Sequence, residues 1–139
     1  MWLDGPHGDM TTDGRRAGAV MVASGIGITP MMSMLRTLAA RGDSRSVRVI
    51  LADTPDEAVF RDELRSLRDR MVSMDVREVG RVAITARILD PLLPEDRFVR
   101  GRLDYFVCGS PRMVGATVSA LTALGIPARR IHTELFDIG

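Results

Sequence analysis

Short apolar runs alternate with longer amphipathic stretches along almost the whole chain. Continuous apolar runs, such as 19–23, are typical of strands that are buried on both faces of a sheet. Apolar residues spaced three and four apart, such as Met31, Leu35 and Leu38, are typical of helices that cover a sheet. The pattern predicts strands at 19–23, 47–52, 75–79, 104–108 and 131–136, and helices at 31–41, 56–70, 84–89 and 112–124. This alternation indicates an α/β fold, a parallel sheet with helices on both faces.

The turn after the first predicted strand has a composition that suits an anionic ligand. Residues 24–30 read Ser-Gly-Ile-Gly-Ile-Thr-Pro and lead directly into a helical pattern. Glycine permits a positive φ and leaves no Cβ between the backbone and a ligand. Pro30 stands where the first helical residue is expected, a position that needs no N–H. Because free N–H groups and the helix dipole favour anions at a helix start, the segment predicts a phosphate site.

Composition narrows the function classes further. All 19 basic residues are arginine, which excludes a lysine that forms a Schiff base or binds a phosphate. The net charge of +1, with arginines scattered among acidic residues, argues against nucleic acid as a partner. A single cysteine, Cys108, excludes an internal disulfide, and two distant histidines predict no metal site. No apolar run is long enough to cross a bilayer, which predicts a cytoplasmic protein.

Three predicted strands end in small or acidic residues. These ends are the turn at 24–29, Asp53 and Thr54 after the second strand, and Gly-Ser-Pro at 109–111. Ligands of parallel α/β sheets bind beyond the carboxyl ends of the strands. A Gly-x-Gly pattern alone is weak evidence, because many such patterns are ordinary turns. The convergence of three such ends on one edge is the stronger indication of a nucleotide site.

Four short motifs occur in order along the chain. They are Gly-Pro-His-Gly at 5–8, Gly-Ile-Gly-Ile-Thr-Pro at 25–30, Cys-Gly-Ser-Pro-Arg-Met at 108–113 and Glu-Leu-Phe at 134–136. Together they resemble the end of the flavin domain, the nucleotide loop, the Cys-Gly-Pro-x-x-Met motif and the terminal Glu-x-Phe of the ferredoxin–NADP reductase superfamily. Leu3 and Asp4 are similar to its ferric reductase and NADPH oxidase branch. The resemblance covers nearly the whole chain.

The resemblance implies five parallel strands in the order 3-2-1-4-5 and a lobe that holds NADH or NADPH for hydride transfer to FAD. It implies that backbone N–H groups of 25–29 bind the pyrophosphate and that Thr29 adds a hydroxyl donor. Cys108, Glu134 and Phe136 are the expected catalytic residues, with Cys108 beside the nicotinamide. The residues expected to bind the cofactor are Ser24, Gly25, Ile26, Gly27, Ile28, Thr29, Pro30, Asp53, Cys108, Gly109, Ser110, Pro111 and Met113.

Asp53 bears on the choice between the two coenzymes. A carboxylate at this strand end would accept hydrogen bonds from the adenosine ribose and repel a 2′-phosphate, which predicts a preference for NADH. The residue types also allow purely structural roles at these positions. Asp53 suits a helix cap, Cys108 a small buried hydrophobe, and Glu134 a solvated strand end. Ser24 and Ser110 replace the family's commoner glycine and proline, but both are small enough to keep the turns.

The family's flavin domain, an antiparallel barrel with an Arg-x-Tyr-Ser/Thr motif, has no counterpart in these residues. Residues 1–14 are expected to be its trailing loop, and residues 15–139 the NAD(P)-binding domain. The FAD is therefore expected on a separate or missing domain or subunit, without which the chain should not turn over. A non-catalytic or vestigial nucleotide-binding module and an unrelated doubly wound protein are the alternatives. The final electron acceptor stays open, as do a membrane-bound partner and a place at the cytoplasmic face of a membrane.

Overall fold

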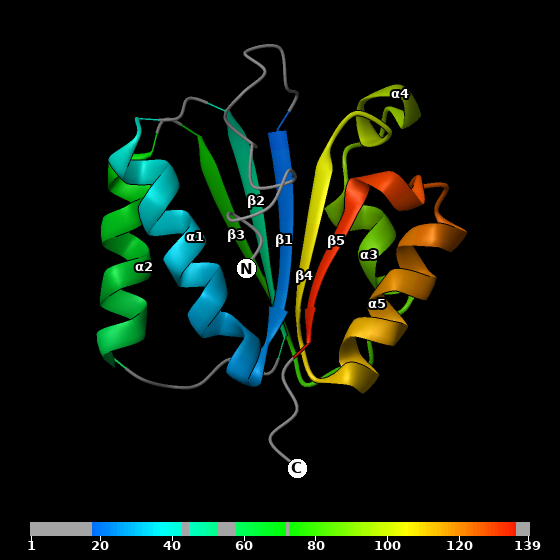
Figure 1. Ribbon diagram of the computed structural model, residues 1–139, viewed down its shortest axis with the longest axis horizontal. Helices are drawn as coiled ribbons and strands as arrows, with labels where there is room; N and C mark the ends of the chain where they lie inside the picture. The colour runs from blue at the N-terminus through cyan, green and yellow to red at the C-terminus, as the bar shows by residue number, and fades with distance from the viewer. Residues whose placement is uncertain (1–17, 43–44, 53–57, 72, 136–139) are drawn as a thin grey trace.

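Five parallel strands form one sheet in the part of the chain that the computed structural model describes, residues 18–42, 45–52, 58–71 and 73–135. The strand order is β3-β2-β1-β4-β5, as the resemblance implies (Figure 1). The strands are β1 (Gly18–Ser24), β2 (Ser46–Ala52), β3 (Met74–Gly80), β4 (Asp104–Gly109) and β5 (Ile131–Leu135). Because β1 lies between β2 and β4, the strand order reverses at the β1–β4 pair, where ligands of such sheets bind.

Helices cover both faces of this sheet (Figure 1). They are α1 (Ile28–Ala40), α2 (Ala58–Arg70), α3 (Ala86–Leu89), α4 (Arg97–Arg100) and α5 (Pro111–Ala123), with 3-10 turns η1 (Gly25–Gly27), η2 (Asp90–Leu92) and η3 (Ala128–Arg130). Helices α1 and α2 lie on one face, and α3 and α5 lie on the other (Figure 1). This arrangement confirms the predicted α/β architecture.

Alternate residues of β1 enter two separate hydrophobic cores. Ala19, Met21 and Ala23 pack in the core under α1 and α2, whereas Val20 and Val22 pack in the core under α3 and α5. Successive side chains of a strand point to opposite faces of the sheet, and both faces are covered here. The continuous apolar run at 19–23 therefore has the cause that the sequence pattern predicts.

The buried face of α1 agrees with the sequence pattern, and the buried face of α5 differs from it. In α1, Met31, Leu35 and Leu38 are fully buried as expected. In α5 the apolar residues of the sequence pattern include Met113, Val118, Leu121 and Leu124, whereas the buried residues are Val114, Thr117, Ala120 and Leu121. The helix is rotated so that this row faces the sheet, while Met113, Val118 and Leu124 pack at its margins. The hydroxyl of Thr117 donates to the Met113 carbonyl at 2.9 Å, so burial leaves this polar group satisfied.

Two predicted helix starts were wrong by a few residues. Helix α1 begins at Ile28 because η1 runs straight into it, so Pro30 is the third helical residue rather than the first. A third-position proline is tolerated, since the first N–H groups of a helix lack partners inside the helix. Helix α3 begins after Thr85, whose hydroxyl accepts from the Ile88 N–H and caps the helix. Helix α4 and the 3-10 turns were not predicted.

Candidate functional site

The turn between β1 and α1 lies at the carboxyl edge of the sheet. Ser24 ends β1, and Gly25 follows with a φ of 53°, in the left-handed region that favours glycine. The Ile28 N–H donates to the Gly25 carbonyl, which closes the turn, and no side chain caps the start of α1. The uncapped helix start is the feature that an anionic ligand would use.

Gly27 brings this turn against the end of β4. A Cβ at Gly27 would overlap the Cys108 carbonyl and would lie 2.7 Å from the Gly109 nitrogen. Both of these are backbone atoms, which cannot rotate away as a side chain can. The sequence suggested that this glycine makes room for a ligand, whereas the structure shows that it makes room for β4. The two glycine motifs at 25–30 and 108–113 are therefore in direct contact.

Helix α5 starts beside the same edge. Ser110 is its N-cap, and the Ser110 hydroxyl accepts from the Met113 N–H at 3.3 Å. Pro111 occupies the first helical position, where a missing N–H costs nothing. The starts of α1 and α5 thus both lie at the carboxyl ends of the paired strands β1 and β4, but a side chain caps only the start of α5.

Cys108 and Glu134 lie opposite each other in the paired strands β4 and β5. Cys108 is fully buried, and Glu134 is half-buried. Burial, with a smaller contribution from the charge of Glu134, raises the pKa of Cys108 to about 12. A thiol with this pKa stays protonated at neutral pH, so Cys108 does not act there as a thiolate nucleophile.

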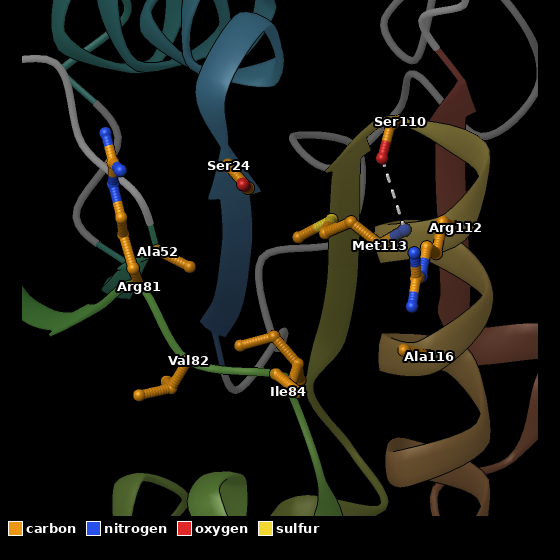
Figure 2. Close-up of a pocket in the computed structure, with 10 residues that line it drawn as sticks. Ser24, Ala52, Arg81, Val82, Ile84, Ser110, Arg112, Met113 and Ala116 are labelled. Carbon is orange, nitrogen blue, oxygen red and sulfur yellow. Dashed lines mark hydrogen bonds between the residues drawn. The ribbon is translucent and has the colours of Figure 1, made fainter.

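A cavity of about 480 Å³ opens at this edge, beyond the ends of β1, β2 and β3 and beside α5 (Figure 2). This volume lies within the range of small-molecule sites. Three of the residues that line it were predicted: Ser24, Ser110 and Met113. The lining residues that were not predicted are Ala52, Arg81, Val82, Ala83, Ile84, Arg112 and Ala116. Cys108 and Glu134 do not line the cavity, so the expected site has two separate parts.

Two arginines line this cavity. Arg81, after β3, and Arg112, on α5, lie on opposite sides of it in Figure 2. None of the described lining residues is an aspartate or glutamate. The chemistry of the cavity therefore suits a ligand with phosphate groups and an apolar, flat portion.

The profile of the oxidoreductase NAD-binding domain family matches residues 21–119, from β1 into α5. The chain belongs to this family. The match includes both the turn at 25–30 and the motif at 108–113, which are the segments that Gly27 brings into contact. The predicted membership of the ferredoxin reductase superfamily is confirmed, and its ferric reductase branch stays a prediction.

Relatives of this NAD-binding domain are oxidoreductases. A flavohemoprotein of Bordetella pertussis is 32% identical over 96% of this chain and 36% of that protein. The reductase component of propane 2-monooxygenase from Rhodococcus jostii is 30% identical over 96% of this chain and 40% of that protein. The flavohem-like FAD/NAD binding domain of nitric oxide dioxygenase from Vibrio cholerae has a TM-score of 0.69 at 27% identity, over 89% of this chain and 52% of that one. The chain thus spans about a third of the flavohemoprotein.

Three predicted residues of the NAD-binding domain fall wholly or partly outside the description that the structure gives. Asp53 and Phe136 lie outside the described residues, and only the backbone of Ile26 is described. None of the helices in the described ranges is long and apolar enough to span a membrane.

The sequence contains a signal for some of the cavity residues that were not predicted. Arg112 lies inside the motif at 108–113, at a position where the motif specifies no residue type. The segment 81–84 carries no motif, but it follows a predicted strand whose end lies at the ligand edge. The strand order alone could have indicated it.

Proposed function

We propose that this NAD-binding domain holds NADH and presents its nicotinamide to FAD on a flavin domain. The observation that carries the proposal is made at the carboxyl ends of the paired strands β1 and β4. There an uncapped helix start adjoins a cavity that is lined by two arginines and, among the described residues, by no carboxylate. The open helix start suits the pyrophosphate of a dinucleotide, and the cavity beside it has room for the rest of the ligand. FAD, when bound on the flavin domain, accepts the hydride.

Three parts of the site have separate roles in this proposal. The turn at 25–29 binds the pyrophosphate through backbone N–H groups other than that of Ile28, which is used within the turn. The Thr29 hydroxyl adds a donor, and Pro30 fixes the first turn of the helix. The cavity receives the adenosine half, and the ends of β4 and β5 receive the nicotinamide half.

The nicotinamide half would lie against Cys108, Gly109, Glu134 and Phe136. Cys108 is neutral and buried, so its role is to support the strand ends on which the ring lies and not to exchange protons. Glu134, opposite Cys108, offers a carboxylate for the carboxamide or for the flavin side. These residues would contribute to the rate by aligning the nicotinamide ring with the flavin ring.

We propose that residues 15–139 form this domain and that residues 1–14 follow a flavin domain in the working enzyme. Relatives that include a flavohemoprotein and a monooxygenase reductase component support both the flavin and the acceptor. A haem or oxygenase protein is therefore the class of acceptor that we propose. A cytoplasmic location, with or without a membrane-bound acceptor, stays a prediction.

The test is to join the chain to the FAD-binding domain of a flavohemoprotein and to follow flavin reduction without oxygen. We expect NADH to reduce the flavin rapidly, the isolated chain to show no turnover, and NADPH to react more slowly because Asp53 repels its 2′-phosphate. Asp53→Asn should narrow the difference between the coenzymes. Absence of both dinucleotide binding and flavin reduction would contradict the proposal and favour a non-catalytic module. Equal or faster reduction by NADPH would contradict only the coenzyme preference.

A further inference from the structure

Arg112 is a charged side chain without a charged partner. It is the second residue of α5, exposed, and lines the cavity (Figure 2). Several other arginines pair with a carboxylate, as Arg36 does with Glu63 and Arg48 does with Asp75. Among the residues that the structure describes, no carboxylate pairs with Arg112. Its guanidinium is therefore available to a ligand.

Apolar side chains, but no aromatic ring, lie beside Arg112 in the described lining of the cavity. Met113 and Ala116 flank it on α5, and Val82 and Ile84 line the segment after β3. Within the described lining, no phenylalanine, tyrosine or tryptophan offers a stacking surface. A planar guanidinium stacks on aromatic faces, so an arginine can take the place of an aromatic side chain.

The two helix starts differ in what they offer to a phosphate. The start of α1 has no side-chain cap, which leaves it open to an anion. The start of α5 is capped by Ser110, so its Met113 N–H is already used. The pyrophosphate should therefore lie at α1, and the base should lie farther along the cavity, beside α5.

We propose that Arg112 stacks its guanidinium on the adenine of the bound dinucleotide, with Val82 and Ile84 against the opposite ring face. The proposal rests on the proposed function, because it is the dinucleotide that places an adenine in this cavity. It makes Arg112 a specificity-determining residue for a flat base. An arginine here could instead contact a phosphate directly, and binding of ADP-ribose and of pyrophosphate distinguishes the two roles.

The test is calorimetric titration of the chain with ADP-ribose and with inorganic pyrophosphate. Arg112→Gln should weaken ADP-ribose about tenfold and leave pyrophosphate unchanged, because a stacking contact is lost and no phosphate contact is. Arg112→Tyr should keep ADP-ribose affinity within about threefold of the original, since its ring restores stacking without the charge. Arg68→Gln, on the exposed side of α2, is the matched control and should change neither affinity.

Two results would overturn the proposal while the proposed function survives. The first is an unchanged ADP-ribose affinity in Arg112→Gln. The second is a phosphate pattern, in which Arg112→Lys keeps the affinity, Arg112→Tyr loses it and pyrophosphate binds more weakly to Arg112→Gln. If the unaltered chain binds neither ADP-ribose nor NADH, the proposed function itself fails, and this assignment fails with it. Circular dichroism of each variant confirms that an exposed substitution leaves the fold intact.

Discussion

Gly27 joins two motifs that are far apart in the sequence. Its backbone φ of −70° is ordinary, so the residue is not required for a left-handed turn. What requires glycine is the approach of Cys108 and Gly109, whose backbone atoms fill the space of a Cβ. The neighbouring Gly25 shows the opposite case, because it has a positive φ and open space around it. Glycine is thus required at Gly27 by close packing and favoured at Gly25 by backbone conformation.

Gly27→Ala should destabilise the protein by about 1–3 kcal/mol, because backbone atoms of β4 must move to admit the methyl group. It should also weaken NADH binding, since the turn and β4 together form the dinucleotide edge. Urea denaturation and a binding titration measure the two effects. Gly115→Ala is the matched control: it lies in α5, with nothing within 4 Å of its added Cβ. This control should stabilise by up to about 1 kcal/mol, and equal effects of the two substitutions would refute the packing argument.

At the scale of an element, one buried arginine holds the connection between α3 and β4. The Arg100 side chain donates to the Pro94 and Asp90 carbonyls and pairs with the Asp90 carboxylate at 2.8 Å. The Tyr105 hydroxyl donates to the Arg100 carbonyl at 2.9 Å, which ties α4 to β4. A four-residue helix is too short to be stable alone, so these contacts, together with the Asp96 N-cap, hold α4 in place.

Arg100→Met should cost about 1–3 kcal/mol of the free energy of unfolding, because the partly buried Pro94 carbonyl loses its donor and the Arg100–Asp90 pair is lost. The neighbouring Arg97 is exposed on the same helix, and Arg97→Met should change stability by less than about 0.5 kcal/mol. Chemical denaturation of the two variants is the measurement. A similar loss in both would show that α4 depends on charge in general rather than on the buried contacts.

At the scale of the whole molecule, β4 lies between β1 and β5 and contributes buried side chains to both cores. Two of the buried side chains of β4 are weak acids. Burial raises the pKa of Tyr105 from 10.0 to about 12, and the charge of Arg100 opposes the rise. The pKa of Cys108 rises from 9.0 to about 12. The groups that couple stability to alkaline pH therefore lie in β4, inside the sheet.

Stability should fall as the pH rises above about 9. The unfolded chain loses the Cys108 proton near pH 9.0, while the folded chain keeps it until about pH 12, so the unfolded state binds fewer protons over this range. The contribution is complete below pH 9.0 and is lost on the way to 12. The free energy of unfolding, measured at several alkaline pH values, should decline less steeply in Cys108→Ala than in the unaltered chain. Parallel declines would show that Cys108 does not contribute.

The sequence by itself determined the five strands, the longer helices and their order along the chain, and the two turns that define the family. Apolar periodicity and turn residues are local properties, so the strand at 19–23 and the stripe of Met31, Leu35 and Leu38 were readable without a fold. The motif at 108–113 even contained Arg112, although nothing local distinguished that position as part of a cavity.

Only the tertiary structure decided which distant segments meet. The contact of Gly27 with Cys108, the cavity between the segment 81–84 and α5, and the contacts that hold α4 all join residues from separate elements. The rotation of α5, which buries Thr117 in place of Val118, also depends on the sheet beneath it. Such features arise from packing and close approach between segments, and a one-dimensional pattern carries no information on them until the elements are assembled.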